Sequence, residues 1–289
     1  MSLTLDKTQF VNGIIEPVNR YFHDPIAAKI VRFLKNTLVT PNQVTYISVL
    51  IGLIAAYIFS LGTLRAFLLA GILLETVMIL DCVDGQLARA KKCASDLGRL
   101  LDGIAGYVIY LAVLIGIMLG IDNYHGVLAL IGIITILRAI SYDYCKLTML
   151  TMIEKGYDGN QQEVIDTYLK ISTNNSTLFM VYFYYLQLQR FIFCGHFISL
   201  RRFNESENLI YKNNILDLEQ RKNYHEKNRT LIAVWSWSGV DLPIFLLVLF
   251  SIFGVLEVFI QPLAIFLTLQ FLITMIYHRM QHSSFLVIQ

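Results

Sequence analysis

The chain has 289 residues, of which 56% are hydrophobic and 15% are charged, and its formal net charge is +2. Soluble globular domains carry about 25% charged residues, so this composition excludes an ordinary soluble domain and predicts an integral membrane protein. The four cysteines form no Cys-x-x-Cys motif, which predicts free thiols without a zinc site (Cys82, Cys93, Cys145 and Cys194).

Six stretches are long and apolar enough to cross a bilayer, for which a helix needs about 20 residues. They are 43–63, 66–84, 101–121, 126–144, 231–253 and 256–277. Lysine and arginine gather before the first stretch, between the second and third, and between the fourth and fifth. This bias predicts that these segments and both termini are cytoplasmic. We expect a multi-pass protein of a bacterial or archaeal cytoplasmic membrane.

The chain is predicted to have four parts. An N-terminal cytosolic or interfacial segment is followed by transmembrane helices 1–4, a cytosolic helical insertion, and helices 5 and 6 (1–40, 41–146, 147–229 and 230–289). In the first part, Asp24-Pro25 favours the start of an amphipathic helix that lies on the membrane surface and reaches Lys35.

The insertion contains a 21-residue aromatic stretch, 177–197, that is long enough for a seventh span. Polar side chains at its centre would make such a span costly (Gln187, Gln189 and Arg190). We interpret it as a cytosolic or interfacial helix. The segment that follows, 206–229, is polar and helix-prone.

Acidic and small residues share one face of each of two neighbouring predicted helices. On the second helix they are Asp81, Asp84, Gly85 and Ala88, and on the third they are Gly98, Asp102 and Gly106. If the two helices pack together, three carboxylates meet and repel one another. A hard divalent cation, Mg²⁺ or Mn²⁺, would relieve this repulsion because it prefers oxygen ligands.

The spacing of these residues resembles a family signature. The string Asp81-x-x-Asp84-Gly85-x-x-Ala88-Arg89, followed after eight residues by Gly98-x-x-x-Asp102, is similar to that of the CDP-alcohol phosphotransferase family. The upstream segment Thr40-Pro41-Asn42-Gln43-Val44-Thr45 resembles the family's entry into its first span. The resemblance covers residues 25 to 145.

The resemblance implies both a fold and a reaction. The fold is an all-α integral membrane protein with six transmembrane helices around a cytosol-facing polar cavity, usually a homodimer. The reaction moves a phosphate-linked group from a CDP-linked donor, such as CDP-diacylglycerol or another CDP-alcohol, to an alcohol acceptor and releases CMP. It would serve phospholipid or glycoconjugate synthesis and would use two divalent metal ions.

The resemblance also assigns roles to individual residues. Metal ligands would be Asp81, Asp84 and Asp102, and the cytidine site would be lined by Gly85, Ala88 and Gly98. Arg89 would support the loop or the diphosphate. Arg138 lies within the fourth span with Tyr142 and Lys146 at helical spacing, and we interpret it as part of a phosphate-binding stripe rather than a lone snorkelling arginine.

One position departs from the pattern: the family's last acid, its proposed general base and a ligand of the second metal, is replaced by Gly106. Tyr107 and Tyr110 are nearby candidates, although a phenol with a pKa near 10 is a poor base at neutral pH unless a metal lowers it. Asp96 is a second candidate, and an acceptor that is already anionic would need no base. Alternatively, the site binds nucleotide without catalysis.

These alternatives define the competing functions. The first is the phosphotransferase, with Asp102, Tyr107 and Tyr110 as catalytic candidates, and the second is a catalytically silent nucleotide-binding subunit. A transporter is a third, but the acids cluster at one end of the spans and no inverted repeat is apparent. Asp241 and Glu257 are interpreted as helix-end acids. Expected partners are the two substrates and membrane lipids, with no nucleic acid.

Overall fold

The computed structural model describes residues 13–174, 177–198 and 215–282. The chain divides into two compact units, which are considered separately. Among the described residues, one unit holds 16–136 and 240–273, and the other holds 13–15, 137–239 (apart from the gaps) and 274–282. The first unit contains the acidic motif, and the second contains most of the predicted insertion.

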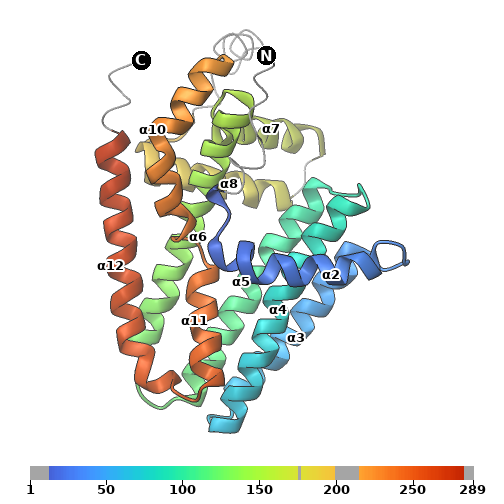
Figure 1. Cartoon of the computed structure of the whole chain (residues 1–289), viewed down its shortest axis with the longest axis vertical. Helices are drawn as coiled ribbons and strands as arrows, with labels where there is room; N and C mark the ends of the chain where they lie inside the picture. Colours follow the sequence, from blue (N-terminus) through green and yellow to red (C-terminus); the bar gives the residue numbers. More distant parts are fainter. Residues whose placement is uncertain (1–12, 175–176, 199–214, 283–289) are drawn as a thin grey trace. The chain divides into compact units, whose positions relative to one another are not determined.

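The described part of the chain is helical and contains no strand, so the predicted all-α fold class is confirmed (Figure 1). In chain order the helices are η1 (Asn19–His23), α2 (Asp24–Leu34), α3 (Pro41–Phe59), α4 (Leu64–Ala90), α5 (Asp96–Gly120), α6 (His125–Lys155), α7 (Gly159–Asn174), α8 (Thr177–Cys194), α10 (Leu218–Ser236), α11 (Asp241–Ile252) and α12 (Leu256–His282). The four-part division and the side of the membrane stay predictions.

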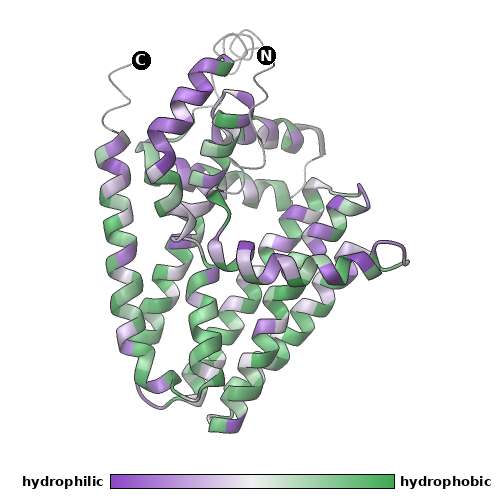
Figure 2. Cartoon of the chain, in the orientation of Figure 1, coloured by the Kyte–Doolittle hydropathy of each residue, from purple (hydrophilic) through white to green (hydrophobic). Residues whose placement is uncertain are grey.

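By length and composition, six helical stretches in the described residues could cross a membrane. They comprise α3, α4, most of α5, α6, the stretch Leu218–Ile252, and most of α12. Figure 2 shows the apolar colouring along α3, α5 and α11. The fifth stretch differs from the predicted continuous span, because α10 ends at Ser236 and α11 begins at Asp241.

In the first unit, α3 packs against both α4 and α5. The α3 and α5 backbones approach closely at two glycines, where a side chain would not fit. A Cβ added at Gly116 would lie closer than 3.0 Å to the Ala56 carbonyl oxygen, and one at Gly120 would be equally close to the Phe59 carbonyl oxygen. This approach fixes α5 beside the helix that also supports α4, so the two acid-bearing helices share one support.

The N-terminal helix is present, but its start differs from the prediction. The chain is already helical through η1, so Asp24 does not cap α2 with its side chain. Its carboxylate instead accepts a hydrogen bond from Gln86 Nε2 at 2.7 Å. The apolar face of α2 is buried against α4, through Ala27 and Val31 among others. The amphipathic helix is therefore packed on protein along this face.

A buried polar pair explains Glu75, an acid in the middle of the apolar α4. Its Oε1 lies 2.9 Å from Nε2 of His23, whose side chain is fully buried. The other imidazole nitrogen of His23 lies 2.6 Å from Asn19 Oδ1. A polar group at this depth needs a partner, and η1 supplies it from a distant part of the sequence.

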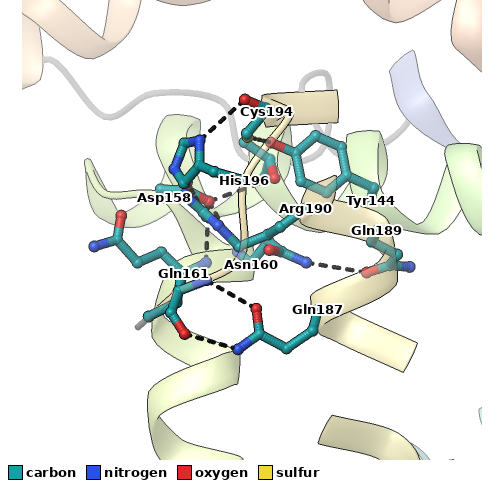
Figure 3. A network of polar contacts seen from close by, with 11 residues as sticks. Tyr144, Asp158, Asn160, Gln161, Gln187, Gln189, Arg190, Cys194 and His196 are labelled. Atoms are coloured by element: carbon teal, nitrogen blue, oxygen red, sulfur yellow. Dashed lines mark hydrogen bonds and ion pairs between the residues drawn. The ribbon is translucent and has the colours of Figure 1, made fainter. Parts of the chain in front are cut away.

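In the second unit, the polar centre of α8 faces a network with α6 and α7 (Figure 3). Arg190 Nη1 lies 3.0 Å from Asp158 Oδ2, and Gln189 bridges Asn160 and the Ile140 carbonyl. Burial alone would lower the pKa of Arg190, but the Asp158 charge raises it above its ordinary value. The polar residues that argued against a seventh span are thus paired inside the protein.

The opposite face of α8 is apolar and exposed. Its members recur at helical spacing (Val181, Tyr184, Leu188 and Phe191). This helix is not among the six stretches that could cross a membrane. A helix with its polar side inward and its apolar side outward suits the membrane interface. The interfacial position predicted for this segment stays a prediction.

Candidate functional site

The acidic motif lies entirely on α4, which continues to Ala90, six residues beyond the predicted end of the second span. Asp84 is only 5% exposed, and its Oδ2 accepts a hydrogen bond from Thr45 Oγ1 at 2.5 Å. Thr45 belongs to the motif that precedes the first span, where Thr40 and Gln43 form a capping box at the start of α3. The two motifs therefore meet at Asp84.

The start of α5 places the third acid. Ser95 caps this helix, and its Oγ accepts a hydrogen bond from the Gly98 backbone nitrogen at 3.0 Å. A Cβ at Gly98 would lie 3.8 Å from Asn42 Oδ1, so this glycine also borders the motif on α3. Asp102 follows one turn later and is half-buried.

The structure brings two of the three predicted acids into contact and places the third near them. The side chains of Asp81 and Asp102 are hydrogen-bonded to each other, and the charge of Asp84 acts on Asp81. Two carboxyl groups in such contact repel unless a proton or a cation lies between them. Asp81 is among the exposed residues of α4.

The chemistry of this donor set fits a hard divalent cation, since all of its members are carboxylates. As the side chains stand, no three His, Cys, Asp or Glu groups in the described part of the chain converge closely enough to hold an ion. One oxygen of Asp84 is taken up by the hydrogen bond from Thr45. The metal role of the three acids stays a prediction.

Small residues border the acids on the same helix. Gly85 and Ala88 are both partly exposed, and a Cβ at Gly85 would lie 3.6 Å from Arg89 Nη1. The Arg89 guanidinium is exposed and its charge acts on Asp84. This arrangement leaves open backbone beside a cation, as a nucleotide diphosphate would require.

Space is available at Gly106, the position at which the family pattern has its last acid. Apart from its chain neighbours and the nearby backbone of its own helix, no described atom lies within 4 Å of the place that a Cβ would take at Gly106. Tyr107 is half-buried, and Tyr110 donates a weak hydrogen bond to the Ile131 carbonyl at 3.4 Å. Tyr110 lies about 12 Å beyond Asp102 along the helix axis. The Asp96 side chain is outside the described part, and all three base candidates stay predictions.

Arg138 belongs to the other unit and is fully buried. Its guanidinium donates to the carbonyl oxygens of Trp237 at 3.0 Å and Gly239 at 3.2 Å, in the break between α10 and α11. A helix end leaves carbonyls without intrahelical partners, and Arg138 satisfies two of them. Its neighbour in the predicted stripe, Tyr142, donates to the Ile14 carbonyl at 2.7 Å. A structural role thus competes with the predicted phosphate contact.

From the sequence, no site role was assigned to a fourth acid, Asp241, whose charge influences the site. The charge of Asp241 acts on Asp81, and its side chain is only 4% exposed. The prediction that it is a helix-end acid is correct, because α11 begins there. Asp241 follows Gly239-Val240 and begins an otherwise uncharged apolar helix. An acid in such a position is unusual.

Comparisons with known proteins point to one family. A model of the CDP-alcohol phosphatidyltransferase family matches residues 38–200, which is more than half of the chain and includes all three predicted metal ligands. An 87-residue stretch, 30% of the chain, is 41% identical to the bifunctional IPC transferase and DIPP synthase of Thermococcus kodakarensis, and covers 19% of that protein. An 82-residue stretch, 28% of the chain, is 43% identical to the archaetidylinositol phosphate synthase of Pyrococcus horikoshii, and covers 42% of it.

Proposed function

The chain belongs to the CDP-alcohol phosphatidyltransferase family, and on that premise we propose that it transfers a phosphate-linked group from a CDP-linked donor to an alcohol and releases CMP. The acceptor's hydroxyl oxygen bonds to the phosphorus that carries the donor's alcohol or lipid group. The bond between that phosphorus and CMP breaks, and the hydroxyl proton is released. The observation that supports the proposal is the contact between Asp81 and Asp102, with Asp84 near them, within the matched residues.

The roles proposed for the residues follow from their positions. Asp81, Asp84 and Asp102 would hold Mg²⁺ or Mn²⁺, and the exposed Arg89 would face the diphosphate. A divalent cation bound there would stabilise the negative charge that develops on the departing CMP. Open backbone at Gly85, Ala88 and Gly98 would admit the cytidine. Thr45 orients the Asp84 carboxylate through its hydrogen bond.

The substrates belong to the family's chemical classes. The relatives are synthases in name, and one is named for an inositol phosphate lipid. This supports a donor that carries a lipid and an acceptor that is a polyol or a phosphorylated polyol. A phosphorylated acceptor is anionic, which suits a site with glycine at the position of the usual base. Phospholipid synthesis is the role that we propose.

The test is CMP release by the purified full-length protein with Mg²⁺ or Mn²⁺. We expect turnover with CDP-diacylglycerol or another CDP-alcohol in a panel of acceptors that includes inositol, inositol phosphate, glycerol phosphate and serine. CMP release must depend on both donor and acceptor, because hydrolysis alone gives CMP without transfer. A protein that binds CDP-donors but releases no CMP with any pair would support the silent subunit instead.

We also propose the sidedness and the assembly. The lysine and arginine bias supports a cytoplasmic site in a bacterial or archaeal membrane, with cytoplasmic termini, and both relatives are archaeal. Cys93 is exposed just after the acidic motif. An impermeant maleimide should label it in inverted vesicles and not in right-side-out vesicles, with Cys93→Ser as the control. Labelling only from outside would contradict this topology.

The assembly that we propose is a homodimer, and light scattering should give the mass of two chains.

A further inference from the structure

We propose that α8 lies flat in the boundary between lipid and water, with its apolar face immersed in the lipid and its polar face bound to the protein. The partner of this face is therefore a lipid surface. The face is formed by four exposed side chains (Val181, Tyr184, Leu188 and Phe191). Three observations support this position: the direction in which α8 crosses α6, the level of the crossing, and the pairing of the polar side of α8.

The contacts between α8 and α6 give the direction of α8. Three side chains of α8 make polar contacts with α6, and the first and last of them are nine positions apart (Tyr185, Gln189 and Cys194). Their partners on α6 all fall within residues 140–144. Nine residues of helix rise about 13.5 Å, whereas four rise about 6 Å. Parallel helices would cover equal lengths of each other, so α8 runs across α6 (Figure 1).

The crossing lies at one end of a membrane span. Helix α6 begins at His125, after the exposed Asp122 and Asn123, and its contacts with α8 come 15 to 19 residues later. This is about 22 to 28 Å along the helix axis, and the hydrocarbon core of a bilayer is about 30 Å thick. Because α6 continues to Lys155, its last residues extend beyond that thickness. A helix that crosses α6 here lies at the boundary between lipid and water.

An exposed tryptophan marks the same level on a different segment. The Trp237 carbonyl, at the end of α10, accepts a hydrogen bond from Arg138, which lies two residues before Ile140 on α6. The Trp237 side chain is 50% exposed. Tryptophan and tyrosine are enriched at membrane–water interfaces, because their rings have an apolar body and a polar group. Trp237 and Tyr184 are thus exposed at the level where such residues gather.

The two sides of α8 suit protein and lipid, respectively. On the inner side, Arg190 and Gln189 are buried and bonded to Asp158 and Asn160 (Figure 3). Arg190 is the only charged residue of α8, so no charge lies on the outer side. A helix face in water is normally covered by polar and charged residues. The polar groups of α8 are therefore satisfied within the protein, and its outer side can enter lipid without burying a charge.

The test measures the depth of single positions in the full-length protein, reconstituted into phosphatidylcholine vesicles. A fluorescent amino acid replaces Val181, Leu188 or Phe191 in turn, and its emission is quenched by lipids that carry a spin label near the start or near the end of the acyl chain. We expect stronger quenching by the label near the start at all three positions, because an interfacial helix is buried by only about 5–10 Å. Two exposed residues are the controls. Ile265, about 14 Å from the start of α12, should be quenched more by the label near the chain end, and Glu226 on α10 by neither.

Each outcome supports or overturns the proposal. If the three positions are quenched no more than Glu226, the face is covered by water or by protein and the proposal is wrong. If Val181 and Phe191 differ in depth by about the 15 Å that separates them along the helix, α8 crosses the bilayer and the proposal is also wrong. If one substituted protein does not fold, the other two positions still give the depth. The result does not depend on CMP release, so a failure of the proposed reaction would leave it unchanged.

Discussion

Asp102→Asn is expected to lower CMP release by about 1000-fold or more with the best donor and acceptor of the panel, the scale of losing a main electrostatic contributor to catalysis. The carboxyl group of Asp102 is hydrogen-bonded to that of Asp81, and it is the acid that α5 contributes to the cluster. Asparagine keeps the shape of the side chain but removes the charge that would hold a cation. The rate should not recover at higher Mg²⁺ concentrations if the ligand is essential.

The measurement is CMP quantified by chromatography over time. Asp122→Asn is the control, because Asp122 is exposed in the turn before α6. It should leave the rate unchanged. Thermal unfolding of both variants should match wild type, which separates catalysis from folding. An Asp102→Asn protein that keeps more than a tenth of the wild-type rate would remove Asp102 from the proposed machinery.

Arg138→Ala is expected to destabilise the protein by about 3 kcal/mol, because the carbonyls of Trp237 and Gly239 lose a charged donor. The carbonyl oxygens of Trp237 and Gly239 lie in the break between α10 and α11, where the helical hydrogen-bond ladder is interrupted. The side chain is fully buried, so its removal also leaves a cavity. The melting temperature should fall by several degrees or more.

The same variant separates the two roles of Arg138. If Arg138 contacts the phosphate, donor binding should weaken and the stability should stay unchanged. If its role is structural, the stability should fall. Melting curves and CDP-donor affinity measured on one preparation distinguish them. Arg65→Ala, which removes an exposed arginine from the start of α4, is the matched control and should change neither quantity. An unchanged melting temperature with weaker donor binding would restore the phosphate contact.

Local features of this chain could be predicted from its sequence. A span needs a certain apolar length, so six spans and the all-α fold follow from composition and hydropathy along the chain. The acids on α4 and α5 have fixed helical spacing, and their meeting required only that these helices come together. Asp81 and Asp102 lie in contact, and the joint metal site predicted for the three acids stays a prediction.

Long-range pairings could not be predicted in this way. Hydropathy predicts one continuous span across residues 237–240, where the structure has a break. The carbonyls that the break frees accept hydrogen bonds from Arg138, about 100 positions earlier. Glu75 had no visible partner, because His23 reaches it from η1. Asp241 was interpreted only as a helix-end acid, since hydropathy does not give the register between α4 and α11.

The contact between Glu16 and Asp241 has a consequence for the order in which the protein matures. It joins residues 225 positions apart, so Glu16 leaves the ribosome long before its partner exists. At roughly 5–20 residues per second, α11 follows the end of α5 by on the order of ten seconds. The acids of α4 and α5 can assemble in that interval, but the N-terminal segment cannot dock on α11. A chain arrested before residue 241 would therefore hold the Asp81–Asp102 pair without the contact by which Glu16 satisfies the amide at the start of α11.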